Sequence, residues 1–256
     1  MQAVQSKLSV HAVTSYLGVF KEPRGLIRLF QIIFAILAFA TACNGRSSTT
    51  LDYGGKDDVI ASSWSYPYRL SRSAIVLNNG TILGTLSTSN DPKPPAEFFL
   101  FTSVMAMLLA LTFTFTYVFL NSLYRNNDLF PTLDFFITFI WTIFWLAGSS
   151  AWAQGVTNIR SLTDFDNIRQ RSGICPSSTI CPDGSVANYA NLIVSVLFGF
   201  LNFVLWLGSL WFVFKETRFF KSHTMQQPQV QAPVYPDIGS PSMQPQSYTQ
   251  SPVVMT

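Results

Sequence analysis

The sequence predicts an all-α membrane protein: a four-transmembrane-helix bundle with two non-cytoplasmic loops and a disordered C-terminal tail. Charged residues make up only 11% of the 256 residues, against about 25% in soluble domains. Four apolar stretches contain two charged residues between them, Arg28 and Asp134. Each stretch is long enough to cross a hydrocarbon core of about 30 Å as a helix. The stretches are residues 26–43, 98–120, 133–153 and 192–214.

A cytoplasmic N-terminal segment, residues 1–25, is expected before the first apolar stretch. Ala40 and Ala42 resemble a signal-peptide cleavage site, so cleavage is one alternative. We favour an uncleaved signal anchor, because the preceding segment and the apolar run are both longer than in ordinary signal peptides. The membrane domain is then expected over residues 26–217, followed by a cytoplasmic tail over residues 218–256.

Basic residues beside the outer stretches predict the orientation. The total numbers of Lys and Arg on the two sides are equal, but density close to the membrane is what matters. Lys21 and Arg24 precede the first stretch, and Lys215 and Arg218 follow the fourth. Both termini are therefore expected in the cytoplasm, with the two longest loops on the opposite side.

The first of these loops, residues 44–97, is polar and contains a predicted hairpin. Two short apolar runs flank Asn79-Gly80, a dipeptide that favours the positive-φ turn between twisted strands. Asn79 also begins the sequon Asn-Gly-Thr and is the candidate glycosylation site, although short sequons arise by chance as well. A glycan there would agree with a lumenal or outer position of the loop.

The second loop, residues 154–191, carries Cys175 and Cys181. In an oxidising compartment the two would form a disulfide that closes a small ring. Two free thiols are the alternative. Cys43 has no evident partner in its own loop, and we interpret it as a small apolar residue at a helix end.

Small residues spaced four apart predict where the membrane helices approach closely. Asn202, within the fourth stretch, is interpreted as an interhelical hydrogen-bond donor rather than a pore residue. We expect these faces to join helices of one subunit, and contacts between subunits are the alternative. The candidate packing residues are Ala38, Ala42, Ala147, Ala151, Ser195 and Gly199.

Two motifs near the chain ends are typical of lipid and adaptor binding. Val13, Tyr16 and Lys21 fit the loose pattern proposed for cholesterol contact. Tyr235 and Ile238 have the spacing of a tyrosine-based sorting signal, which clathrin adaptors bind. Chance matches are the alternative in both cases. The tail is rich in Pro, Gln and Ser, a composition that cannot bury a core.

Composition and motifs exclude several function classes. A net charge of +3 without a basic run gives no footprint for nucleic acid. The two histidines and three cysteines lack metal-ligand spacing, and no phosphate-binding loop or hydrolase motif is present. We therefore expect no enzyme, metal or cofactor. A pore formed by assembled subunits remains an alternative, although no Pro interrupts an apolar stretch.

Five segments resemble the synaptophysin family, which includes synaptophysin, synaptoporin, pantophysin and mitsugumin within the four-helix MARVEL membrane domains. The likeness extends from about Gly18 to Phe219. The final apolar stretch, with its exit Phe-Lys-Glu-Thr, is its most specific part. The segments are residues 34–41, 66–70, 148–153, 198–202 and 211–217.

The resemblance implies a synaptic or small secretory vesicle protein that forms homo-oligomers, associates with cholesterol and sorts a synaptobrevin-like partner. It also implies a disulfide, because Cys175 and Cys181 match the bridged cysteines of the family's second lumenal loop. The first loop lacks the family's cysteine pair, and the tail lacks its Tyr/Gly-rich repeats. A junction-type membrane protein is a further alternative.

Overall fold

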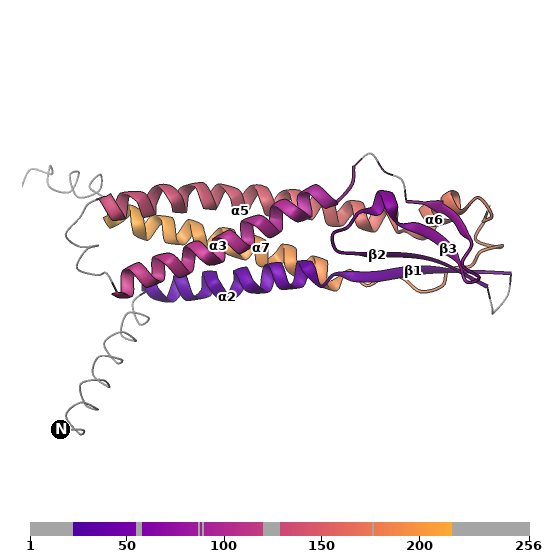
Figure 1. The fold of residues 1–256 in the computed structure, drawn as a ribbon, viewed down its shortest axis with the longest axis horizontal. Helices are drawn as coiled ribbons and strands as arrows, with labels where there is room; N and C mark the ends of the chain where they lie inside the picture. Colours follow the sequence, from indigo (N-terminus) through magenta and orange to yellow (C-terminus); the bar gives the residue numbers. More distant parts are fainter. Residues whose placement is uncertain are drawn as a thin grey trace, which may run out of the picture.

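The computed structural model contains four long helices, which form a bundle (Figure 1). Each contains an apolar stretch long enough to cross a membrane. The structure describes residues 23–216 except 55–57, 87, 89, 120–128 and 176. The helices are α2 (Pro23–Cys43), α3 (Lys93–Phe119), α5 (Leu129–Leu162) and α7 (Ala190–Glu216). The predicted four-helix fold class is confirmed.

The helices pack as a closed ring in the order α2, α3, α5 and α7, with α7 returning to α2. Small and hydroxyl side chains are buried inside, for example Ala35, Ala106 and Ser103. Such residues let membrane helices approach closely. Large apolar side chains such as Phe115 and Leu197 are exposed on the outer faces, where they meet lipid in a membrane.

Two helices extend further than the apolar stretches that predict them. α3 begins at Lys93, with Pro94 and Pro95 in its first turn, where the missing N–H of Pro costs no hydrogen bond. α5 continues beyond residue 153 through a polar segment to Leu162. At 1.5 Å per residue, its 34 residues span about 51 Å, so α5 projects well beyond a hydrocarbon core.

The first long loop folds into an antiparallel four-stranded sheet in the order β1-β2-β3-β4. The predicted hairpin is present as β3 and β4, and Gly80 in its turn has a φ of +85°. β1 and β2 are not predicted from the sequence, because Ser and Thr fill half of the positions of β1. The strands are β1 (Arg46–Tyr53), β2 (Asp58–Ser65), β3 (Ala74–Leu77) and β4 (Ile82–Thr85).

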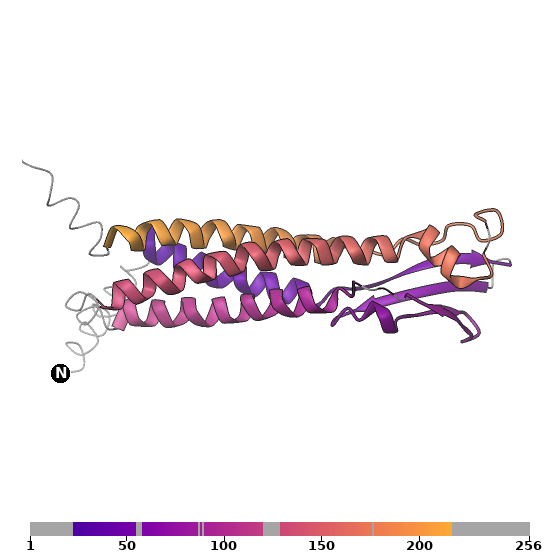
Figure 2. The same cartoon turned by 90° about the horizontal axis from the view of Figure 1, so that it is seen from above.

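The second long loop packs against this sheet. Its short helix α6 (Phe165–Ser172) contacts β4, β3 and β1. Residues 182–188 then return to the bundle along the free edge of β1: the Asp52 N–H donates to the Pro182 carbonyl oxygen at 3.1 Å, and the Thr50 N–H to that of Ser185 at 2.9 Å. We call the sheet, α6 and residues 182–188 the head, which lies at one end of the bundle (Figure 2).

Candidate functional site

The two charged residues of the apolar stretches meet inside the bundle. Arg28 on α2 and Asp134 on α5 form an ion pair with an N–O distance of 2.7 Å, and their side chains are only 5% and 4% exposed. Thr138, one turn further along α5, donates a hydrogen bond to the same carboxylate oxygen at 3.0 Å. Because α2 and α5 both begin near this pair, it lies at the bundle end remote from the head.

Arg28 also contacts the other two helices. Its guanidinium donates to Gln31 Oε1 at 3.1 Å, and Gln31 Nε2 donates to the carbonyl oxygen of Leu205 on α7 at 3.3 Å. The ring centroids of Phe113 on α3 and Trp206 on α7 lie 4.7 and 5.6 Å from the guanidinium carbon. One basic side chain therefore connects all four helices.

The burial of this ion pair determines its role. An ionised side chain in a membrane costs several kcal/mol unless it is paired, so α2 and α5 each carry a penalty that is relieved when the two helices lie side by side. Removing one partner of a buried pair costs about 3–5 kcal/mol. We infer that the pair has a structural role: it favours the helix arrangement in which Arg28 and Asp134 neutralise one another.

An aromatic cluster closes the other end of the bundle, where the head begins. The buried Tyr68 donates through its hydroxyl to the carbonyl oxygen of Ala42 at the end of α2. Its ring centroid lies 5.2 Å from that of Trp152 on α5. Trp152 stacks on Phe99 of α3 at 6.2 Å and donates to Ser195 Oγ of α7 at 2.8 Å. The first loop thus reaches into the bundle through one tyrosine.

The residues around Tyr68 are closely packed. A Cβ atom on Gly45 would lie 2.5 Å from a side-chain carbon of Leu192 and would also overlap the Tyr68 hydroxyl. Tyr68 itself has a φ of 60°, in the left-handed region, which costs a non-glycine residue roughly 1–3 kcal/mol. Burial raises the pKa of Tyr68 above its usual range, so the phenol remains a neutral hydrogen-bond donor.

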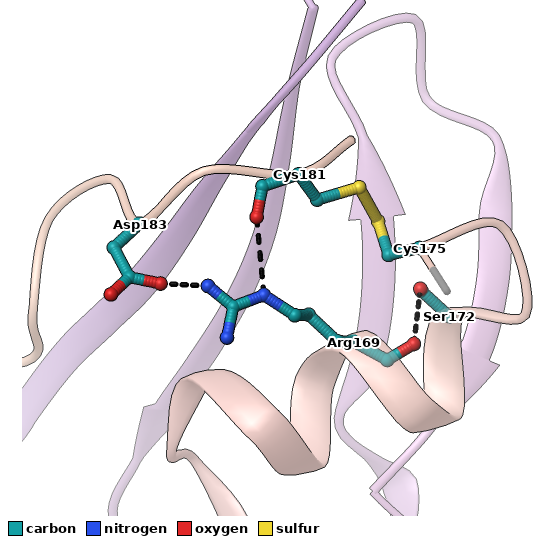
Figure 3. The surroundings of a disulfide bond; sticks show 5 residues. All are labelled: Arg169, Ser172, Cys175, Cys181 and Asp183. Carbon is teal, nitrogen blue, oxygen red and sulfur yellow. Dashed lines mark hydrogen bonds and ion pairs between the residues drawn. A yellow bond between two sulfur atoms is a disulfide. The ribbon is translucent and has the colours of Figure 1, made fainter. Parts of the chain in front are cut away.

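In the head, Arg169 of α6 holds the start of the returning segment, as Figure 3 shows. Its Nε donates to the carbonyl oxygen of Cys181 at 3.1 Å, and its terminal nitrogens form ion pairs with Asp183 and, at 2.8 Å, with Asp166. Cys175 and Cys181 form a disulfide with their Cα atoms 5.6 Å apart. Arg169 and the disulfide fasten the second loop to itself, and the backbone hydrogen bonds of Pro182 and Ser185 fasten it to β1.

Comparison with known families identifies the architecture. Residues 19–212 match MARVEL, a family of membrane-associating domains. The chain belongs to the MARVEL family. This is a family of membrane-associating domains and not of enzymes, and no three His, Cys, Asp or Glu side chains gather as a metal site in the part of the chain that the structure describes.

The MARVEL bundle buries four of the six candidate packing residues: Ala38, Ala42, Ser195 and Gly199. A Cβ atom on Gly199 would lie 2.5 Å from Ser149 Oγ and 2.7 Å from a ring carbon of Phe99, so these side chains would have to shift to admit any larger residue. Ala147 and Ala151 differ from the expectation, because Ala147 is exposed and Ala151 only half-buried on the outer side of α5. Ala147 therefore lies on a face of α5 that is not covered by another helix of the same subunit.

Asn202 is buried, but its hydrogen bond differs from the predicted interhelical one. Its Nδ2 donates to the carbonyl oxygen of Phe198 within α7 at 3.0 Å, because the carbonyl one turn earlier is the nearest acceptor. Its Oδ1 has no hydrogen-bond partner among the described residues.

Of the remaining predicted residues, the structure describes Asn79. Asn79 is exposed at the tip of the β3–β4 hairpin, and its Oδ1 accepts a hydrogen bond from the Thr81 N–H at 2.9 Å. The cholesterol-contact residues and the sorting signal lie outside the described residues; they are Val13, Tyr16, Lys21, Tyr235 and Ile238.

Sequence reasoning missed the ion pair, although a signal for it exists. Arg28 and Asp134 are the two charged residues of the apolar stretches, and both follow shortly after the start of helices that run in the same direction. Opposite charges at matching depths in two membrane helices predict a pair. For Tyr68 and Arg169 no such signal exists, because their partners depend on how the loops fold.

Proposed function

We propose that this MARVEL protein organises the membrane of synaptic or small secretory vesicles by lateral association rather than by catalysis. The observation that carries the proposal is the closed bundle: the Arg28–Asp134 cluster lies at one end and the Tyr68–Trp152 cluster at the other, while the outer faces are apolar. Such a bundle presents its surface to lipid and to other membrane helices.

The vesicle assignment rests on the sequence resemblance to the synaptophysin family. In this proposal the chain forms homo-oligomers, gathers cholesterol and a synaptobrevin-like single-span protein, and takes part in vesicle trafficking and endocytic recycling. The outward position of Ala147 supports contacts between subunits on the outer side of α5, because small residues favour close helix approach. Tyr235 and Ile238 would recruit a clathrin adaptor.

Imaging of the tagged protein beside vesicle and cell-contact markers tests the location. Punctate overlap with vesicle markers and co-purification with a synaptobrevin-like protein are the expected results. Tyr235→Ala should increase the amount at the cell surface, and Tyr248→Ala in the same tail is the matched control. Stable accumulation at cell contacts with no effect of Tyr235→Ala would contradict the vesicle proposal.

Reconstitution into planar bilayers separates lateral association from conduction. The proposal expects no reproducible ion current from the purified protein. A reproducible current that Asn202→Leu changes would favour the alternative, an oligomeric pore, because Asn202 carries a buried carbonyl oxygen without a partner among the described residues.

A further inference from the structure

A polar cavity lies beside the disulfide, and the two cysteines differ in their contact with it. The cavity has a volume of about 470 Å³, and among the described residues Cys175 lines it while Cys181 does not. Cys175 keeps 4% of its surface exposed and Cys181 none. The other lining side chains include Asp166, Gln170, Ser177 and Ser178.

The Cys181 end of the ring is held by contacts that do not depend on the disulfide. Arg169 binds the Cys181 carbonyl oxygen and the Asp183 carboxylate (Figure 3). The next residue, Pro182, accepts a hydrogen bond from the Asp52 N–H of β1. Cleavage of the S–S bond therefore leaves residues 181–188 fastened to α6 and β1.

We propose that Cys175 is a thiol-exchange site, at which a low-molecular-weight thiol opens the ring while the rest of the head stays folded. The thiolate of the reagent attacks Cys175 Sγ, the S–S bond breaks, and its electron pair leaves on Cys181 Sγ, which takes up a proton. A second reagent thiolate attacks the mixed disulfide, releasing Cys175 as a thiol and the reagent as its own disulfide. The polar cavity admits a small hydrophilic thiol such as glutathione.

Peptide mass spectrometry on the purified full chain tests the site of attack. The background is Cys43→Ser, which removes the exposed free thiol. After brief treatment with limiting glutathione and acid quenching, the glutathione adduct is expected on Cys175 in about tenfold excess over Cys181, because access controls exchange. Adducts in equal amounts, or mainly on Cys181, would overturn the proposal. The result does not depend on which membrane carries the protein.

Hydrogen exchange tests the consequence. Within the ring, the N–H groups of Ile180 and Cys181 donate to the Ser177 carbonyl oxygen at 3.2 and 3.1 Å. Reduction should speed their exchange about tenfold and leave the Thr50 and Asp52 amides of β1 unchanged. Equal acceleration in both groups would show that reduction unfolds the head, and no acceleration would show that the disulfide does not hold the ring; either result overturns the proposal.

A variant separates the effect of the disulfide from that of the Arg169 contacts. Arg169→Met should speed exchange at Thr50 and Asp52 even with the disulfide intact, since it removes the contacts to Cys181 and Asp183. Asp166→Asn is the matched control, because it removes the charge of the more exposed partner of Arg169 and keeps the contacts to Cys181 and Asp183. Unchanged hydrogen exchange at Thr50 and Asp52 in Arg169→Met would contradict the proposal that Arg169 holds the returning segment independently of the disulfide.

Discussion

At the scale of single residues, the Arg28–Asp134 pair keeps α2 and α5 side by side, because a buried charge without its partner costs free energy. Asp134→Leu should lower the free energy of unfolding by about 3–5 kcal/mol, because Arg28 would remain buried without its carboxylate. Adding Arg28→Met to that variant should restore most of the loss. Unfolding of the detergent-solubilised protein, followed by tryptophan fluorescence, measures both.

The exposed ion pair of the head is the control for this prediction. Asp166 pairs with Arg169, but 87% of its side chain is exposed, and such pairs contribute about 0–1 kcal/mol. Asp166→Asn should therefore change stability little. If Asp134→Leu were as mild as Asp166→Asn, the ion pair would not select the helix arrangement.

Two glycines of α7 give a second residue-scale prediction. Gly199→Ala should destabilise the bundle by about 1–3 kcal/mol, because the new Cβ would overlap Ser149 and Phe99. Gly208→Ala is the matched control, since nothing lies within 4 Å of a Cβ atom there, and Ala is the better helix former. Melting temperatures of the two variants compare them directly; equal temperatures would contradict the close contact at Gly199.

At the scale of elements, Tyr68 links the end of α2 to the head, and its raised pKa makes that link sensitive to alkali. Folding favours the neutral phenol, so the contribution is complete below the ordinary pKa of about 10 and is lost as pH rises through the raised value. Wild type should lose about 1 kcal/mol of stability for each pH unit above 10. Denaturant titrations at pH 7 and 11 measure this loss.

Tyr68→Phe separates the hydroxyl from the ring. The variant keeps the packing against Trp152 but lacks the donor to Ala42, and it should cost about 1 kcal/mol at pH 7. Its stability should then depend less on pH between 7 and 11 than that of wild type. The same alkaline loss in both proteins would assign the effect to another group.

At the scale of the whole molecule, the side of the membrane on which the head lies determines whether it can be glycosylated and whether an added protease can reach it. With both termini cytoplasmic, Asn79 should carry a glycan in microsomes, and endoglycosidase should shift the mobility of wild type but not of Asn79→Gln. Asn78→Gln keeps the sequon and is the control. The tail should be cut by added protease while the head is protected; protection of the tail with cleavage of the head would reverse the orientation.

Much of the membrane domain could be predicted from the sequence, because hydropathy is a property of each residue and lipid imposes a minimum helix length. The β3–β4 hairpin was predictable for a similar reason, since Asn79-Gly80 fixes its turn locally. The end of α5 at Leu162 could not be predicted in this way. Apolar composition indicates which residues lie in lipid, whereas a helix can continue beyond the membrane as long as its backbone hydrogen bonds do.

The sequence by itself determined the class of the protein and its four apolar stretches, as well as the positions of the two charges inside them. Only the tertiary structure decided that Arg28 faces Asp134, that Ala147 faces outward, and that Tyr68 and Arg169 fasten the two loops. The physical reason is that composition and periodicity are local quantities, whereas an ion pair between α2 and α5, or a Ser/Thr-rich strand such as β1, is defined by partners far away in the chain.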